Sequence, residues 1–498
     1  MKRQAAGQQT SAAVAAMLAA DPEGPWPLWV LRGDDHGVGE PIGTLDSGPM
    51  AYVDERGLIG WEDGRWSLDW WVRTDEGWKY PSRTRAVRQA IDATPIIETS
   101  FAVPGGDLVA RVAAVQLSGE AVVTVDYTND SPTAVALALA IRPIDLDGIG
   151  MAESVKIYDN TMSIGGRVQL VADRIPASSV AVSDFASLPP AVERANAEPS
   201  TEATSTNGTA QAASVFAMPH HSTLRVVLGA DAVVADLPQL EAIAKGWSAH
   251  LDQFLEVEVE GSPIGDELSL VERRLATALR GGKVVRTRAA IGEWSALDDL
   301  SVATALMEMG DVNPAAEIVL DHLDSDRLLA MAAGEREAAF DALVRLWHLT
   351  RRSEVIDAAS ETLDVPAEVL AGPTPDAVMS QSDAWPVQAA RRVHEIRSAF
   401  VIERDGELHL LTGFAEDWRG RSIDVRRART AAGWLSFSLR WHGARPALLW
   451  SLEPLGQSGN AEHDTGSAPA IVVRAPTLDA EWVAFEADGE ALLAEQPV

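Results

Sequence analysis

Cysteine is absent from this chain of 498 residues. Its absence excludes disulfide bonds, thiolate metal sites and a cysteine nucleophile. Long apolar runs are missing as well, and no segment approaches the ~20 apolar residues that a membrane helix needs. At the N-terminus, polar residues separate the basic pair Lys2 and Arg3 from a weakly apolar run, which is a poor match to a signal peptide. We therefore expect a cytoplasmic protein in which residues 1–24 form a flexible tail.

Positive charge is scarce. The chain has 41 Lys and Arg against 73 Asp and Glu, for a net charge of −32. Nucleic acids and anionic membranes would be repelled by such a surface, so we expect neither as a partner. Because the acidic residues are spread along the whole chain, we interpret them first as a solubilising surface.

In the first half of the chain, apolar and polar residues alternate as they do in β-strands. Residues 25–236 contain short apolar-polar runs separated by turn sequences, for example at 54–57 and 104–107. This pattern predicts a large antiparallel β-sandwich. Residues 187–213 are rich in Ala, Ser, Thr and Pro and lack an apolar period, so we predict a mobile loop there.

In the second half of the chain, the spacing of apolar residues changes twice. Residues 237–398 carry apolar residues at helical spacing with short turns between the runs, which predicts an α/α domain of helical hairpins. In its central hairpin, Gly310 ends one helix and Pro314 begins the next. Residues 399–498 return to alternation and predict a smaller C-terminal β-sandwich. The fold class is therefore multidomain α+β, with three domains.

Carboxylates and an aromatic ring gather where the first helix of that hairpin begins. Glycoside hydrolysis needs two carboxylates, about 5 Å apart for retention or about 6.5–9.5 Å for inversion, and one of them must keep its proton. Glu293 beside Trp294 is the candidate acid, with Asp298 or Asp299 as its partner and Glu395 as a more remote alternative. A structural interpretation stays open, because Asp298 and Asp299 fall in a first helical turn and would stabilise the helix dipole.

Tryptophan is abundant, with sixteen residues against four tyrosines. Tryptophan serves both cores and sugar-binding platforms, and Trp294, Trp385 and Trp71 are our candidates for substrate binding. Trp70 and Trp71 are neighbours on a predicted strand, so their rings should face opposite sides of the sheet.

Histidines give little support to a metal site. His220 and His221 are adjacent on a strand and point to opposite faces, so they cannot both bind one ion without a bend. His322 and His348 stand alone in the sequence. We expect neither a metal nor another cofactor.

Two stretches resemble a known family. Residues 410–443, LLTGFAEDWRGRSIDVRRARTAAGWLSFSLRWHG, and residues 293–310 are similar to parts of the glucoamylase-like and maltose-phosphorylase-like glycoside hydrolases. The resemblance implies a β-sandwich, an (α/α)6 toroid that carries catalysis, and a small β domain. Residues 237–398 have room for about half a toroid. Leu297 stands where the family has an arginine that grips sugar hydroxyls, and no stretch matches the loop that carries the family's general acid.

These departures favour one of two hypotheses. The first is a non-catalytic or degenerate relative that binds a sugar or a protein partner. The alternative is an active glycoside hydrolase that uses a carboxylate pair as general acid and base. Half a toroid would leave an apolar face incompletely covered, so we also expect it to pack on the large β-sandwich or to form a homo-oligomer.

Overall fold

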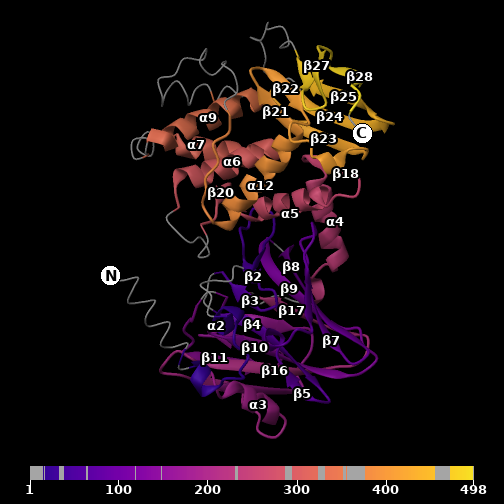
Figure 1. The fold of residues 1–498 in the computed structure, drawn as a ribbon. Coiled ribbons are helices and arrows are strands. Elements are labelled where there is room, and N and C mark those ends of the chain that lie inside the picture. The colour runs from indigo at the N-terminus through magenta and orange to yellow at the C-terminus, as the bar shows by residue number, and fades with distance from the viewer. Residues whose placement is uncertain are drawn as a thin grey trace. The chain divides into compact units, whose positions relative to one another are not determined.

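A computed structural model shows a multidomain α+β protein rich in antiparallel sheet (Figure 1). The chain divides into two compact units: unit 1 is Met1–Lys245 with Thr287–Ala289, and unit 2 is Gly246–Arg286 with Ala290–Val498. The division into three domains stays a prediction. The structure describes residues 15, 17–32, 39–62, 66–117, 119–146, 148–229, 234–286, 294–323, 331, 333–351, 355, 376–454 and 471–496.

Unit 1 is built from two large sheets. The first has eight strands, in the order β1 (Glu40–Ile42), β2 (Ala51–Val53), β3 (Ile59–Trp61), β4 (Ser67–Thr74), β10 (Val135–Arg142), β16 (Gln211–Met218) and β14 (Ser178–Val182), with β5 (Gly77–Lys79) also paired to β4. The second has nine strands, in the order β15 (Glu202–Thr204), β11 (Ser154–Tyr158), β12 (Thr161–Ile164), β13 (Arg167–Ala172), β17 (Ser222–Leu228), β9 (Glu120–Asn129), β8 (Gly106–Leu117), β7 (Ile97–Val103) and β6 (Val87–Ala90).

Side chains from both sheets share one apolar core. The Trp70 ring of β4 lies 5.9 Å from that of Tyr127 on β9 and 6.1 Å from that of Phe101 on β7. Alternation along each strand sends every second residue into this core, where these large aromatic rings pack among aliphatic side chains.

The two predicted turns named above are confirmed. Residues 54–57 lie between β2 and β3, and residues 104 and 105 connect β7 to β8. Gly57 and Gly105 have φ values of 82° and 84°, which only glycine adopts without strain. Asp54 closes its turn by accepting the backbone N–H groups of Arg56 and Leu58 at 2.8 and 2.9 Å.

The mobile loop predicted over residues 187–213 is wrong. That stretch contains the helix α3 (Leu188–Arg194), the edge strand β15 and the start of β16. Leu188 and Val192 of α3 are buried in a second apolar cluster against Trp71. Composition suggested disorder, but two apolar side chains spaced four apart were enough to dock one short helix.

Unit 2 is organised around one helix. Its helices are α5 (Ile264–Thr277), α6 (Ala296–Met309), α7 (Val312–His322), α9 (Ala333–Thr350) and α12 (Trp385–Phe400), and α4 (Leu240–Leu251) crosses from unit 1 into unit 2. Helix α6 contacts α5, α7, α9 and α12 (Figure 1). Every residue from 298 to 309 is buried, as expected for a helix packed on all sides.

The turn after α6 is confirmed as predicted. Gly310 has a φ of 108° and its N–H donates to the carbonyls of Leu306 and Met307, which ends the helix. Helix α7 begins at Val312, so Pro314 falls within its first turn, where a missing N–H costs least.

Strands complete unit 2. The five-stranded sheet runs β18 (Glu256–Val259), β23 (Ile423–Arg429), β24 (Gly433–His442), β25 (Arg445–Pro454) and β28 (Asp488–Leu492), and the four-stranded sheet runs β21 (Val401–Arg404), β22 (Glu407–Leu410), β26 (Val473–Ala475) and β27 (Asp479–Ala484). A two-stranded ribbon joins β19 (Leu279–Arg280) to β20 (Lys283–Val284). β18 comes from the segment predicted to be helical. Helices and strands share one continuous apolar core.

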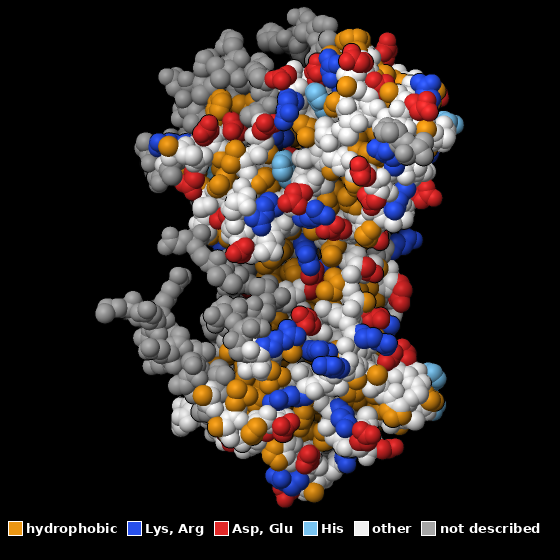
Figure 2. All heavy atoms as spheres, in the orientation of Figure 1, with side chains coloured by type: hydrophobic (Ala, Val, Ile, Leu, Met, Phe, Trp, Pro, Cys, Tyr) orange, Lys and Arg blue, Asp and Glu red, His pale blue; other side chains and the backbone are white. Residues whose placement is uncertain are grey.

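One face of the molecule is mixed in charge. On the face drawn in Figure 2, acidic and basic side chains are intermingled and do not form a large field of one sign. Across the described parts of the chain, no helix has the length and apolar character to cross a membrane.

Candidate functional site

The predicted site lies at the start of α6. We call Trp294, Ser295, Asp298 and Asp299 the α6 entrance. Glu293, the candidate acid, lies outside the described residues. Asp298 and Asp299 are 2% and 6% exposed, so both carboxylates are buried in unit 2.

Asp298 caps its own helix. Ser295 accepts the backbone N–H of Asp298 on its hydroxyl at 3.3 Å, and Asp298 Oδ2 accepts the backbone N–H of Ser295 at 2.7 Å. This reciprocal pair is a capping box, which satisfies two N–H groups that the helix cannot pair. The other oxygen, Oδ1, accepts the hydroxyl of buried Ser380 at 2.5 Å. Asp298 thereby ties α6 to the segment that precedes α12.

Asp299 joins a different set of side chains. Its Oδ1 accepts the indole N–H of Trp294 at 2.8 Å. Its Oδ2 lies 3.0 Å from Nε2 of buried His322 and accepts Nη2 of Arg286 at 3.2 Å. Each oxygen of Asp298 and Asp299 is therefore engaged by a neighbour from the same unit.

The sequence did not reveal three of these partners. His322 was interpreted as an isolated residue, yet it comes from the end of α7 to meet Asp299. Arg286 and Ser380 were not considered. The antiparallel hairpin brings the end of α7 beside the start of α6, and that proximity was the one signal that could have pointed to His322.

The two other candidate tryptophans lie elsewhere. Trp385 is half-buried at the start of α12, and its indole N–H is buried with no hydrogen-bond partner among the described residues. Trp71 belongs to unit 1, is fully buried beneath α3, and meets Tyr80 edge to face at 5.3 Å. The opposite-face prediction for Trp70 and Trp71 is confirmed, and neither ring reaches the surface.

Helix α6 carries a third buried carboxylate. Oε1 of Glu308 lies 2.9 Å from Nδ1 of His394 on α12, with which it forms a hydrogen bond, and 3.5 Å from Nη1 of Arg345 on α9. Burial alone would raise the pKa of Glu308, but the hydrogen bond from His394 and the charges of His394, Arg397 and Arg345 outweigh it and lower the pKa. Glu308 is thus held ionised as a link between three helices, which suits a structural role better than proton donation.

Glu272 on α5 shows the opposite behaviour. It is 1% exposed, and among the described residues its Oε1 has no hydrogen-bond partner. Burial raises the pKa of Glu272 well above its usual range, and the charge of Arg427 opposes this only in part. Burial therefore favours the protonated form of this carboxyl group.

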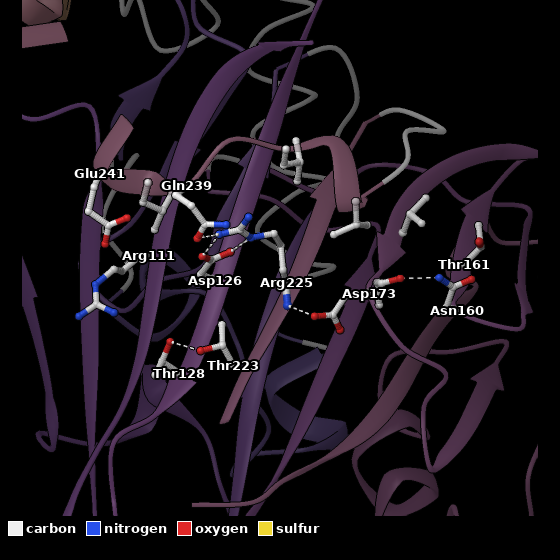
Figure 3. Close-up of a pocket in the computed structure, with 15 residues that line it drawn as sticks. Arg111, Asp126, Thr128, Asn160, Thr161, Asp173, Thr223, Arg225, Gln239 and Glu241 are labelled. Atoms are coloured by element: carbon white, nitrogen blue, oxygen red, sulfur yellow. Dashed lines mark hydrogen bonds and ion pairs between the residues drawn. The ribbon is translucent and has the colours of Figure 1, made fainter. Parts of the chain in front are cut away.

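Unit 1 contains a polar cleft that the sequence did not predict. It has a volume of about 870 Å³ and lies on the outer face of the nine-stranded sheet (Figure 3). We call it the sheet cleft. Its lining is Arg111, Asp126, Thr128, Asn160, Thr161, Val171, Ala172, Asp173, Thr223, Arg225, Val234, Leu237, Gln239, Leu240 and Glu241.

A row of alternating charges crosses the cleft. Arg225 on β17 is the cross-strand partner of Asp126 on β9, which is in turn the partner of Arg111 on β8. Arg225 holds Asp126 through two bonds of 2.6 Å, and the next partner, Glu98 on β7, accepts Nε of Arg111 at 2.8 Å. At the other end, Asp173 Oδ2 accepts the backbone N–H of Arg225 at 3.1 Å. We call these five residues the charge ladder.

The sequence contained a signal for this ladder. Each ladder residue of β8, β9 and β17 is a charged residue between apolar neighbours on its strand. Strand pairing could not be deduced from the sequence, and only pairing places these charges side by side.

No protein-family model matches the chain, and no curated protein matches it. Among solved structures, the chain is similar to a bacterial glucoamylase complexed with acarbose, with a TM-score of 0.46 and 10% identity over 76% of this chain and 70% of that one. It is also similar to a protein assigned as a kojibiose phosphorylase, from the human microbiome, with a TM-score of 0.27 and 10% identity over 56% of this chain and 45% of that one. Both fall in the class of (α/α)6 glycoside hydrolases and phosphorylases that the sequence resembles.

Proposed function

We propose that this protein is a non-catalytic relative of the (α/α)6 glycoside hydrolases that binds a carbohydrate. The observation that carries the proposal is the engagement of Asp298 and Asp299. Each of their four oxygens has a partner within its own unit, from Ser295, Ser380, Trp294, His322 or Arg286.

Glycoside hydrolysis would need something different from these groups. A general acid must direct a proton at the leaving oxygen, and its partner must present a lone pair to water or to the sugar. Carboxylates that cap a helix and hold an indole and an imidazole meet neither requirement. The sequence adds Leu297 at the position where the family grips sugar hydroxyls with arginine.

The finer architecture belongs to the same proposal. It comprises a large β-sandwich over residues 25–236, a shortened toroid-like α/α domain over 237–398 and a small β-sandwich over 399–498. The shared core of the two sheets of unit 1 supports the first part. The helices around α6 support the second.

A paired screen tests the proposal. Maltooligosaccharides, trehalose and chromogenic glycosides are offered to the wild type and to Glu293→Gln, with and without inorganic phosphate. We expect an oligosaccharide to raise the melting temperature of both proteins, because a ligand that binds only the folded state stabilises it, with no turnover by either.

Two results would contradict the proposal in different ways. Turnover by the wild type that Glu293→Gln abolishes while remaining folded would identify an active hydrolase or phosphorylase. The absence of any thermal shift with any sugar would remove carbohydrate as the ligand class.

A further inference from the structure

The sheet cleft of unit 1 has the chemistry of a binding site for an uncharged ligand. Two arginines line it against three carboxylates. The charge of one of these carboxylates, Asp173, is offset by an arginine outside the lining, since Nε of Arg174 donates to Asp173 at 2.9 Å. An anion or a cation would meet nearly as much repulsion as attraction here, so charge alone selects neither.

Hydrogen-bonding groups surround the charge ladder. The hydroxyls of Thr128 and Thr223 lie 3.0 Å apart at the edge of the cleft, and Thr161 adds another hydroxyl to its lining (Figure 3). Asn160 gives its amide N–H to the carbonyl of Ala172, which leaves its amide oxygen as an acceptor. Hydroxyls and amides both donate and accept, as do the hydroxyls of a sugar.

The ladder itself presents fixed donors and acceptors. Asp126 is buried and bound by Arg225 at 2.6 Å, so the contacts within the protein already hold this pair in position. Arg111 uses Nε for Glu98, and among the described residues its two Nη groups have no protein partner. Groups fixed in advance lose little entropy when a ligand binds.

The cleft also has apolar surface where the C–H face of a sugar ring could rest. Val171, Leu237 and Leu240 contribute to its lining. Tyr158 is 71% exposed and is the cross-strand partner of Thr161, so its ring stands on the same face of the sheet as the cleft. An exposed tyrosine beside hydroxyl-rich polar groups is an arrangement suited to stacking on a sugar.

We propose that the sheet cleft is the binding site for a neutral oligosaccharide, held by the charge ladder and the threonine hydroxyls and stacked on Tyr158 at the rim. The inference deepens the proposed function, since it gives the carbohydrate a site, and that site is separate from the α6 entrance. It assigns a ligand-binding role to unit 1.

The test uses the full chain and isothermal titration calorimetry. The probes are three neutral oligosaccharides, maltotetraose, cellotetraose and laminaritetraose, with trigalacturonate as the anionic comparison. Thr223→Val removes a hydroxyl from the cleft without changing its shape, and Tyr158→Ala removes the exposed ring. Thr204→Val is the matched control, because Thr204 is an exposed threonine on β15 of the same sheet and does not line the cleft.

We expect one neutral oligosaccharide to bind. Thr223→Val and Tyr158→Ala should each raise its dissociation constant about two- to tenfold, which corresponds to the loss of one hydrogen bond or one ring contact. Thr204→Val should leave it unchanged. Hydrogen exchange with saturating sugar should slow in peptides covering residues 160–173 and 222–228. Both effects together support the assignment.

Each failure has its own meaning. Equal affinity in all variants, or protection confined to unit 2, would overturn the sheet cleft while leaving the proposed function in place. Tighter binding of trigalacturonate would overturn the neutral ligand class. Absence of binding by any probe would overturn both proposals.

Discussion

At the scale of single residues, the buried carboxylates of unit 2 differ in how fully they are hydrogen-bonded. Asp298, Asp299 and Glu308 are each held by donors from neighbouring elements, whereas one oxygen of Glu272 has no partner among the described residues. Burial raises the pKa of Glu272, whereas at Glu308 the hydrogen bond from His394 and the nearby positive charges outweigh burial and lower the pKa. The same residue type thus responds to pH in opposite ways within one unit.

Replacement of Glu272 should stabilise unit 2 at neutral pH. Because burial raises the pKa of Glu272 in the folded state, the contribution of Glu272 to stability is fully present below its unfolded pKa near 4.5 and is lost as pH rises through the folded pKa. Glu272→Gln should remove that loss and gain about 1–3 kcal/mol at pH 8, the cost of an unsatisfied buried group, with little gain at pH 4. Urea unfolding at both pH values measures it.

The exposed Glu258→Gln on β18 is the control for that experiment. An equal gain from both variants would point to net charge as the cause. A loss of stability in Glu272→Gln at pH 8 would mean that the carboxylate is ionised and paired.

Removal of the Asp298 side chain should destabilise the protein without changing sugar affinity. Asp298→Ala breaks the capping box and leaves the buried hydroxyl of Ser380 without its acceptor, so we expect a loss of about 2–4 kcal/mol. The exposed Asp383→Ala, on the segment before α12, should cost almost nothing. Chemical unfolding measures the stability of the variants, and calorimetric titration of the folded variants measures their affinity for the sugar. A selective loss of sugar binding in Asp298→Ala would place the ligand at the α6 entrance.

At the scale of elements, the α6–α7 turn depends on a closely packed glycine. Gly310 adopts a left-handed φ of 108°, and a Cβ added there would lie 2.9 Å from the ring of Trp434 on β24. The turn therefore has two demands on this position: a backbone conformation that glycine tolerates, and space against a tryptophan.

Gly310→Ala and Gly443→Ala separate those demands. Gly443 has a φ of 65° with open space around its position, so alanine there should cost about 1 kcal/mol from backbone strain alone. Gly310→Ala should cost about 1–3 kcal/mol more, because it also displaces the Trp434 ring. Thermal unfolding compares the two, and equal costs would mean that the ring shifts freely.

At the scale of the whole molecule, each unit has a large apolar core of its own, which implies two folding units. One core joins the two sheets of unit 1, and the other joins the helices and strands of unit 2. Units with their own cores can unfold in separate transitions.

Calorimetry with one variant in each unit tests this independence. Leu188→Ala removes a fully buried side chain of α3, so it should lower only the transition of unit 1, by about 2–5 kcal/mol. Gly310→Ala should lower only that of unit 2. If either variant shifted both transitions equally, the two units would be coupled.

The local structure of this chain was predictable where short-range chemistry decides it. The turns at 54–57 and 104–105 follow from glycine and aspartate preferences, and the end of α6 at Gly310 follows from the need for a left-handed residue. The short helix α3 was missed because its stability comes from burying Leu188 and Val192, and its composition gives little sign of it. Strand β18 was missed because its partner lies more than 150 residues away.

The candidate site was predicted only in part, because its local features follow from the sequence and its long-range contacts do not. That Asp298 and Asp299 begin a helix beside Trp294 is local, and the structure has them there. Their partners Ser380 and His322 come from other elements, and those partners decide that the carboxylates are engaged. The sheet cleft could not be predicted from the sequence, because its residues come from five strands, the helix α4, a short 3-10 helix and the segments that connect them.

The sequence by itself determined the α+β class, the order of its strand-rich and helical regions, the acidic net charge, and the resemblance to the (α/α)6 enzymes. These features depend on composition and on periods of a few residues, which neighbouring side chains set. Only the tertiary structure decided which carboxylates are capped, which one has an oxygen without a donor among the described residues, and which outward charges align into a ladder. Those outcomes depend on contacts between distant segments, and the free energy of such contacts is set by packing and burial that no local pattern records.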